Sequence, residues 1–261
     1  MIGISNMQPQ IINSINRVDT RMATVNQELT SGKKTLNAAE EGIVTRLNSD
    51  IAGFGSARDN ISRSTNVVTV AQAALSSIAD IMTEMKELAT NSASDNVSAV
   101  DKDKLNETFA SLLLQIDDLV NSAEIDGINL VKAGSADLDI QVGLSAGDSF
   151  TIPAQASSIT DLSINALSIA SGGDPAAAIT ALETAIGTVS ASQSSLGAVQ
   201  TGLESRDNTV STISDSLTDT VGDIEHVDLE ILRMEMEQLK MQKNIDYWLV
   251  GVFNDQVRTI S

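Results

Sequence analysis

The sequence from Leu182 to Ile224 reads LETAIGTVSASQSSLGAVQTGLESRDNTVSTISDSLTDTVGDI, with an apolar residue at every seventh position. A 3.5-residue repeat of this length predicts coiled-coil-like packing, because only a supercoil keeps such a stripe facing its partner. The second seam positions are less regular, since Ser192, Arg206 and Thr220 interrupt them. The apolar positions are Leu182, Val189, Leu196, Leu203, Val210, Leu217 and Ile224.

Two other stretches, residues 68–89 and 105–123, have the spacing of amphipathic helices. In both, apolar residues recur every three or four positions, which places them on one helical face. The polar run NSASDNVS (Asn91–Ser98) separates the two stretches. We therefore expect a turn there and an antiparallel helix pair.

Helix starts are marked by side chains that accept hydrogen bonds from backbone amides. Ser98, with Asp101 three residues later, predicts the start of the helix over 105–123. Asp174 before Pro175 predicts the start of the long C-terminal helix, because proline is favoured at the first helical position. A further helix start is expected at Ser56, which follows two nearby glycines.

Between about residues 126 and 153 the apolar period changes to that of strands. The segments DLDIQVG (Asp137–Gly143) and SFTIP (Ser149–Pro153) alternate around the turn LSAGD, which predicts a small β-hairpin. The following stretch, residues 154–173, is rich in Ser, Ala and Thr and weakly periodic. We expect it to be a short exposed loop.

The composition favours thin helical seams over a deep core. Hydrophobic residues make up 42% of the 261 residues, but aromatic residues only 2%, and large cores usually rely on rings. The chain has no cysteine, which excludes disulfides and thiolate chemistry. Its apolar runs are shorter than the roughly 20 residues of a membrane helix, and no secretory signal is recognisable.

Charge is distributed unevenly along the chain. The net charge is −19, which argues against a nucleic acid as partner. Residues 1–63 and 231–261 are close to neutral, so residues 64–230 carry all of the excess acid. Neutral apolar ends can pack densely against copies of themselves, whereas the acidic middle is better placed in water.

Both ends of the chain have amphipathic helical spacing but too little length for a core of their own. Short isolated helices are marginal in water. The two ends must therefore pair with each other, pair with sister copies, or stay disordered until assembly. The expected fold is mainly α: an elongated coiled-coil-like helical bundle with a small β-hairpin and paired N- and C-terminal helices.

Candidate catalytic or metal-binding residues are scarce. His226 is the only histidine, and a zinc site needs several ligands at fixed spacing. Asp117 and Asp118 are adjacent on a helix and point in different directions, so a solvated face is favoured over acid–base chemistry. No phosphate-binding or dinucleotide fingerprint is present. We expect no enzyme activity, no cofactor and no metal.

Several short motifs, in this order and spacing, resemble those of bacterial flagellins. They are LTSGK (Leu29–Lys33) with NAAEE (Asn37–Glu41), DGINL (Asp126–Leu130), IQVG (Ile140–Gly143) and SLGAVQ (Ser195–Gln200). The resemblance extends over nearly the whole chain, but only about 50 residues separate the helical pair from the returning helix. A minimal flagellin without large variable outer domains is therefore implied.

The resemblance implies a domain order and a function. Residues 1–32 would form the N-terminal inner-core helix, residues 33–55 a spoke, residues 56–225 the helical rod and residues 226–261 the C-terminal inner-core helix. The implied function is that of a secreted structural subunit, which self-assembles into the extracellular flagellar filament used for motility. The alternatives are a hook–filament junction (hook-associated) protein and a non-flagellar helical scaffold.

The implied self-assembly interface lies on the apolar stripes of both terminal helices. The aromatic cluster near Trp248 favours contact between subunits, with packing against the N-terminal helix as the alternative. The interface positions are Ile4, Ile11, Ile15, Val18, Met22, Val25, Leu29, Leu232, Leu239, Ile245, Trp248, Leu249, Val252 and Phe253. The spoke positions are Ser31, Gly32, Lys33, Lys34, Glu40 and Glu41.

The implied partners are identical subunits in a helical polymer, a flagellar export chaperone, and the cap and hook-associated proteins, with no nucleic acid and no membrane insertion. Type III export would account for the missing cleavable signal. Two positions depart from the family pattern: Glu28 stands where an arginine is usual, and Glu84 stands where receptor-recognised flagellins carry an arginine. The reversed charge at Glu84 predicts weak recognition by the innate receptor.

Overall fold

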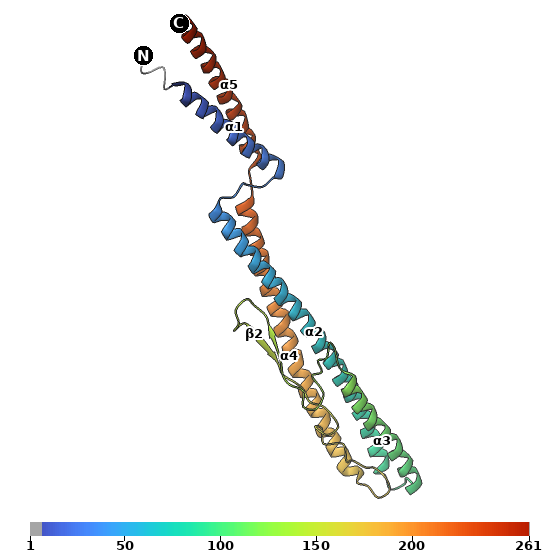
Figure 1. Cartoon of the computed structure of the whole chain (residues 1–261). Helices are drawn as coiled ribbons and strands as arrows, with labels where there is room; N and C mark the ends of the chain where they lie inside the picture. Colours follow the sequence, from blue (N-terminus) through green and yellow to red (C-terminus); the bar gives the residue numbers. More distant parts are fainter. Residues whose placement is uncertain (1–6, 261) are drawn as a thin grey trace. The chain divides into compact units, whose positions relative to one another are not determined.

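The computed structural model describes residues 7–260, with the side chains of residues 9–255. The chain divides into two compact units, one made of residues up to 49 and from 215 onward, the other of residues 50–214. Figure 1 shows the order of the elements. They are α1 (Met7–Ser31), α2 (Ala38–Ser92), α3 (Ala99–Ser122), β1 (Leu138–Gln141), β2 (Ser149–Ile152), α4 (Pro175–Glu225) and α5 (Leu229–Ile260).

The unit of residues 50–214 is held by one apolar cluster from α2, α3, α4 and the segment between α3 and α4. The seven-residue repeat supplies the part on α4, where Leu182, Leu196 and Leu203 are fully buried. Val189 and Val210 are buried as well, so the predicted seam is confirmed over the first five positions. Positions 217 and 224, which belong to the other unit, are only half-buried.

Small residues let the helices of this cluster approach closely. Ala71, Ala178 and Ala185 are buried, alternating with larger side chains. Phe109 of α3 is the largest fully buried side chain among the described residues. The cluster therefore consists mainly of aliphatic side chains around one fully buried ring, with Phe54 and Phe150 half-buried against it, as the aromatic-poor composition predicts.

Two of the three predicted helix starts are confirmed. The amide of Asp101 donates to Ser98 Oγ (3.2 Å) at the start of α3, and the amide of Ala177 donates to Asp174 Oδ1 (2.9 Å) at the start of α4. The third, at Ser56, is wrong. Its hydroxyl donates to the carbonyl of Ala52 one turn back, inside an uninterrupted helix.

Helix α2 starts instead at Ala38, directly after Asn37. The amides of Ala39 (2.9 Å) and Glu40 (3.0 Å) donate to Asn37 Oδ1, which caps the helix. The expected spoke over residues 33–55 is therefore non-helical only up to residue 37. The cap at Asn37 sets the start of α2, and Gly53 and Gly55 do not interrupt the helix, because a single glycine weakens a helix by only about 1 kcal/mol.

The predicted hairpin is confirmed, with β1 and β2 antiparallel and Leu138 paired with Ile152. The hairpin packs against α2 and α4 at positions where each of these helices has a glycine. Phe150 packs over Gly202 of α4, and the guanidinium of Arg206 lies 4.0 Å from the ring centroid. Asn60 of α2 donates to the carbonyl of Gln141 (3.2 Å).

The segment of residues 154–173 departs from its prediction as an exposed loop. Leu162, Ile164 and Ile169 are buried in the apolar cluster. The amide of Ile169 donates to Asn106 Oδ1 of α3 (2.8 Å), and its carbonyl accepts from Ser92 Oγ of α2 (2.5 Å). The segment lacks a helical period because it fills the space beside α3 without forming a helix itself.

Gly53 of α2 is the position where the hairpin turn comes closest to a helix. A Cβ there would lie 2.4 Å from Cδ2 of Leu144. Cδ2 is the end of a side chain that is 45% exposed and can turn away, so we expect Gly53→Ala to gain less stability than its helix propensity predicts, and the double variant with Leu144→Ala to gain the full amount. Gly55→Ala is the matched control, because nothing lies within 4 Å of its Cβ position. It should stabilise by about 0.5–1 kcal/mol in urea unfolding; equal effects at both glycines contradict the contact.

Candidate assembly site

The terminal helices α1 and α5 pack against each other within one unit (Figure 1). On α1, Val18 and Val25 are buried at seven-residue spacing; on α5, Leu232 is buried. The positions on α5 that face α1 follow a 3–4 spacing and are all buried or half-buried. These are Leu232, Met236, Leu239, Lys243, Asp246, Val250 and Phe253.

Three polar pairs fix the register of α1 against α5. Ser14 donates to the buried carboxylate of Asp246 (2.9 Å). Asp19 pairs with Lys243 (2.6 Å), and Arg21 forms two parallel hydrogen bonds with Glu235 (2.7 and 2.9 Å). These contacts fix the antiparallel alignment of the two helices but add little to the free energy of folding, because exposed ion pairs contribute about 0–1 kcal/mol each.

The two flanking ion pairs shift the titration of their cations. The hydrogen bond to Glu235 raises the pKa of Arg21. The hydrogen bond to Asp19 likewise raises the pKa of Lys243. Both cations therefore keep their charge throughout the neutral pH range.

The chain leaves α1 through a turn centred on Gly32. Gly32 has φ +68°, a left-handed conformation that favours glycine, and its amide donates to the carbonyl of Glu28 (2.9 Å). The Glu28 side chain is buried and accepts from the amide of Thr35 (2.9 Å). Glu28 thus closes this turn.

The turn after α1 is joined to the connection between α4 and α5. Lys33 and His226 form an isolated antiparallel bridge, and the Lys34 amide donates to the Glu225 carbonyl (2.8 Å). The Lys33 ammonium pairs with the Glu225 carboxylate. Lys33 and Lys34 of the predicted spoke therefore contact residues of the same chain. His226 lies where the two connections meet, and its side chain is exposed.

Glu40 reinforces the cap of α2 and gives it a pH dependence. Its carboxylate pairs with Lys34 (2.6 Å) and accepts from the Asn37 amide (3.0 Å), and the Lys34 hydrogen bond is the main cause of its lowered pKa. A folded-state pKa below the ordinary 4.5 stabilises the cap above that pH, and the stabilisation is lost as the pH falls through the folded value.

We therefore expect the amides of Ala39 and Glu40 to exchange faster below about pH 4.5 than acid-catalysed chemistry alone predicts. Glu40→Gln should flatten this dependence. Glu41→Gln, one residue on, is the matched control and should leave it unchanged. The same pH profile in Glu40→Gln as in the parent protein contradicts the assignment.

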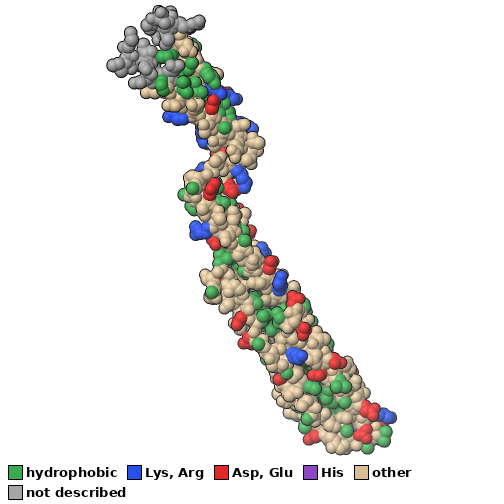
Figure 2. All heavy atoms as spheres, in the orientation of Figure 1, with side chains coloured by type: hydrophobic (Ala, Val, Ile, Leu, Met, Phe, Trp, Pro, Cys, Tyr) green, Lys and Arg blue, Asp and Glu red, His purple; other side chains and the backbone are tan. Residues whose placement is uncertain are grey.

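The side of α5 that faces away from α1 carries a second apolar stripe, which we call the α5 stripe. Its positions repeat at 3–4 spacing, and all are exposed, with Trp248 67% exposed. Figure 2 shows hydrophobic side chains at the surface of this unit. The stripe consists of Ile231, Met234, Met241, Ile245, Trp248 and Val252, interrupted by Gln238.

The predicted interface residues fall into three groups. Val18, Val25 and Leu232 are already buried between α1 and α5. Ile245, Trp248 and Val252 belong to the exposed α5 stripe. The half-buried remainder consists of Ile11, Ile15, Met22, Leu29, Leu239, Leu249 and Phe253, while Ile4 lies outside the described residues.

Three members of the α5 stripe were missed from the sequence: Ile231, Met234 and Met241. The signal was present, because these residues keep the 3–4 spacing of Ile245 and Trp248. One helix can carry two apolar stripes, and the second is overlooked when all apolar residues are assigned to a single contact surface. Their role in assembly, like that of the predicted residues, stays a prediction.

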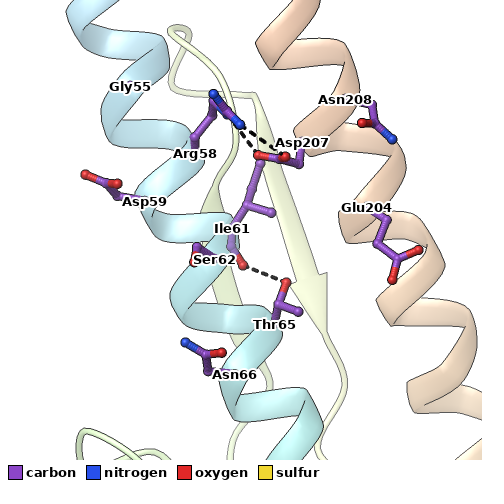
Figure 3. Close-up of a pocket in the computed structure, with 10 residues that line it drawn as sticks. All are labelled: Gly55, Arg58, Asp59, Ile61, Ser62, Thr65, Asn66, Glu204, Asp207 and Asn208. Carbon is purple, nitrogen blue, oxygen red and sulfur yellow. Dashed lines mark hydrogen bonds and ion pairs between the residues drawn. The ribbon is translucent and has the colours of Figure 1, made fainter.

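A groove with a volume of about 760 Å³ lies between α2 and α4 in the other unit (Figure 3). Arg58 of α2 reaches across it to Asp207 of α4 through two hydrogen bonds (3.0 and 3.4 Å). Asp59 and Glu204 also line it, together with Ser62 and Thr65, and the Thr65 hydroxyl donates to the carbonyl of Ile61 (2.9 Å). The groove therefore offers a polar contact surface.

Within residues 7–260, no cluster of three or more His, Cys, Asp or Glu side chains is placed to hold a metal ion. None of the helices in the same described part of the chain has the length and apolar character needed to span a membrane.

Comparison with known proteins gives the family. Residues 2–136 match the bacterial flagellin N-terminal helical region, and residues 179–258 match the bacterial flagellin C-terminal helical region. The chain belongs to the bacterial flagellin family. Only residues 137–178, with the hairpin and the buried segment after it, separate the two regions, so this flagellin is a small form without the variable outer domain.

Curated relatives agree with this assignment, and solved structures share the fold. Flagellin FljK of Caulobacter vibrioides is 23% identical over 254 residues, 95% of this chain and 93% of its own. The crystal structure of Bacillus cereus flagellin has a TM-score of 0.54 at 24% identity, covering 58% of this chain and 88% of its own. A Vibrio parahaemolyticus structure described as a flagellar hook-associated protein has a TM-score of 0.61 at 13% identity, covering 72% and 98%.

The flagellin is accordingly a structural subunit of the flagellar filament, and the family serves motility. The hook-associated alternative is not favoured, because both helical regions and FljK point to flagellins, whereas a structural likeness at 13% identity shows the fold alone.

Proposed function

We propose that this flagellin polymerises by covering its α5 stripe with sister subunits, and that the extracellular filament so formed acts as a passive propeller. The proposal is carried by the exposure of the α5 stripe after α1 and α5 have paired. Six large apolar side chains on one helical face, with Trp248 and Val252 toward its end, are costly to leave in water. Sister copies are the partners that a filament supplies.

The direct test is seeded polymerisation of the purified protein, observed by electron microscopy. Fragments of sheared filaments added to monomer should elongate, and amide exchange in α5 should slow in the polymer relative to the monomer. Monomer that ignores the seeds, or that already shows full protection along the α5 stripe, contradicts the proposal.

The charge distribution supports the same arrangement. The excess acid lies in residues 64–230, and Figure 2 shows acidic side chains along the surface of that region. The assembling segments are nearly neutral, so their close approach meets little repulsion. We propose that the terminal helices form the inner layer and that the acidic unit faces water.

The remaining partners follow from the family. We propose export of the unfolded chain through the flagellar type III channel, with a chaperone covering α5 beforehand, and contact with cap and hook-associated proteins at the filament ends. A chaperone on α5 would shield the same stripe that sister copies later cover. No catalytic activity, nucleic acid or membrane insertion belongs to this function.

Recognition by the mammalian innate receptor should be weak. Glu84 is exposed on α2 and places a negative charge where recognised flagellins carry an arginine. We expect Glu84→Arg to raise potency in a reporter-cell assay at least tenfold. Glu87→Arg, one turn further along α2 and also exposed, is the control with the same charge change. Potency of the parent protein equal to that of an enteric flagellin contradicts the prediction.

A further inference from the structure

The α5 stripe needs a partner surface, and the α1–α5 pair offers a groove on another of its sides. The groove has a volume of about 780 Å³. Its apolar floor contains Met22 and Leu29 of α1 and Met236 of α5. That volume is in the range of cavities that enclose a drug-sized molecule, and therefore suits a few apolar side chains.

Groove and stripe lie on different faces of α5. Residues advance by about 100° each around a helix, so Met236 and Lys240 fall on one flank of the seam with α1. Met241 and Trp248 fall on the far side. A single subunit therefore cannot place its α5 stripe in its own groove.

The symmetry of a filament restricts which surface of a neighbouring subunit the α5 stripe can contact. Subunits of an open helical polymer are related by one repeated operation, and their contacts are heterologous, joining two different surfaces. A stripe that met the same stripe of another copy would form a two-fold contact, which closes at the dimer. The α5 stripe of one copy must therefore bind some other surface of the next.

The outer side of α1 is a poor candidate for that surface. Over residues 9–31, Ile12 is the one large apolar side chain that α1 exposes. The hollow on this side is lined by polar residues such as Asn13, Asn16 and Arg17. It offers nothing apolar to cover Trp248.

The rim of the groove also matches the stripe in charge. Arg233, Lys240 and Lys243 stand over the apolar floor, against Asp19 and Glu237. Lys243 and Lys240 pair with these two carboxylates, while Arg233 makes no ion pair with any described side chain. At the start of the α5 stripe, exposed Glu230 provides a carboxylate that a neighbouring Arg233 could bind.

We infer that the groove between α1 and α5 receives the α5 stripe of a second copy, giving a head-to-tail contact that repeats along the filament. This rests on the proposed polymerisation and specifies which two surfaces meet. Ile245 and Trp248 act as knobs, and Met22, Leu29 and Met236 form the hole.

The absence of cysteine makes the contact testable by disulfide cross-linking. Ala23→Cys introduces a thiol on the exposed wall of the groove. Gln238→Cys, Ile245→Cys and Val252→Cys introduce thiols along the α5 stripe, the first without removing an apolar side chain. Each stripe variant is mixed in equal amounts with Ala23→Cys, seeded into filaments and oxidised.

We expect at least one mixed pair to give covalent dimers at more than ten times the yield of either variant alone. Asn13→Cys, on the polar outer side of α1, replaces Ala23→Cys as the control and should give no such dimers. Dimers of a stripe variant with itself at equal yield would overturn the inference in favour of a two-fold contact. Filaments that form without any mixed dimers would also overturn the inference. If the cysteine-free parent protein forms no filaments, the proposed polymerisation itself is refuted.

Discussion

We expect Trp248→Ala to raise the critical concentration for seeded polymerisation roughly a hundredfold. A tryptophan side chain buries about 150–250 Å², and 67% of Trp248 is exposed before assembly. Covering this surface at about 25 cal/mol per Å² stabilises each contact by about 3 kcal/mol, which corresponds to a factor of about 100 in affinity. The measurement is the monomer concentration that remains in solution at equilibrium with filaments.

The same substitution should hardly affect the isolated chain, because the side chain is mostly outside the α1–α5 seam. Far-UV circular dichroism of the monomer should match that of the parent protein. Gln242→Ala is the control on the same helix, since Gln242 is exposed and belongs to neither apolar stripe. If monomer and polymer lose helix signal equally, Trp248 packs inside the subunit and the assignment of the α5 stripe to assembly is wrong.

Phe109→Ala has the largest expected effect on stability, a loss of about 3–5 kcal/mol. The ring is 1% exposed and is the largest fully buried side chain of the cluster, so no buried neighbour matches the volume that its removal leaves. The long helices around Phe109 are close-packed, so the cavity left by the ring could close only if whole helices moved. Urea unfolding followed through amide exchange in α3 measures the loss.

Leu114→Ala is the matched control for Phe109→Ala on the same helix. Leu114 is 67% exposed, so its truncation should change stability by no more than about 0.5 kcal/mol. Similar losses at both positions would mean that α3 lies in a different orientation from the one described.

The helices, the hairpin and two of the caps were predictable because their signals are local. Ser98 and Asp174 act on amides within three residues, and the strand pair is separated by a short turn. The seven-residue repeat of α4 also needs only its own sequence, because periodicity shows the buried face before the partner is known.

Features that depend on distant residues were missed or wrong. The glycines near residue 55 look like a helix break, but Gly53 is small because Leu144 of the hairpin turn lies against it. Residues 154–173 lack a period, yet Asn106 and the apolar cluster hold Ile169 in place. The two stripes of α5 were merged because sequence spacing alone does not tell which one pairs with α1.

The chain contains a single indole, and it lies on the surface that assembly is proposed to cover. Trp248 thus makes the protein its own optical reporter. Transfer of an indole from water to an apolar contact moves its emission to shorter wavelength, so filament growth can be followed in real time without attaching a dye.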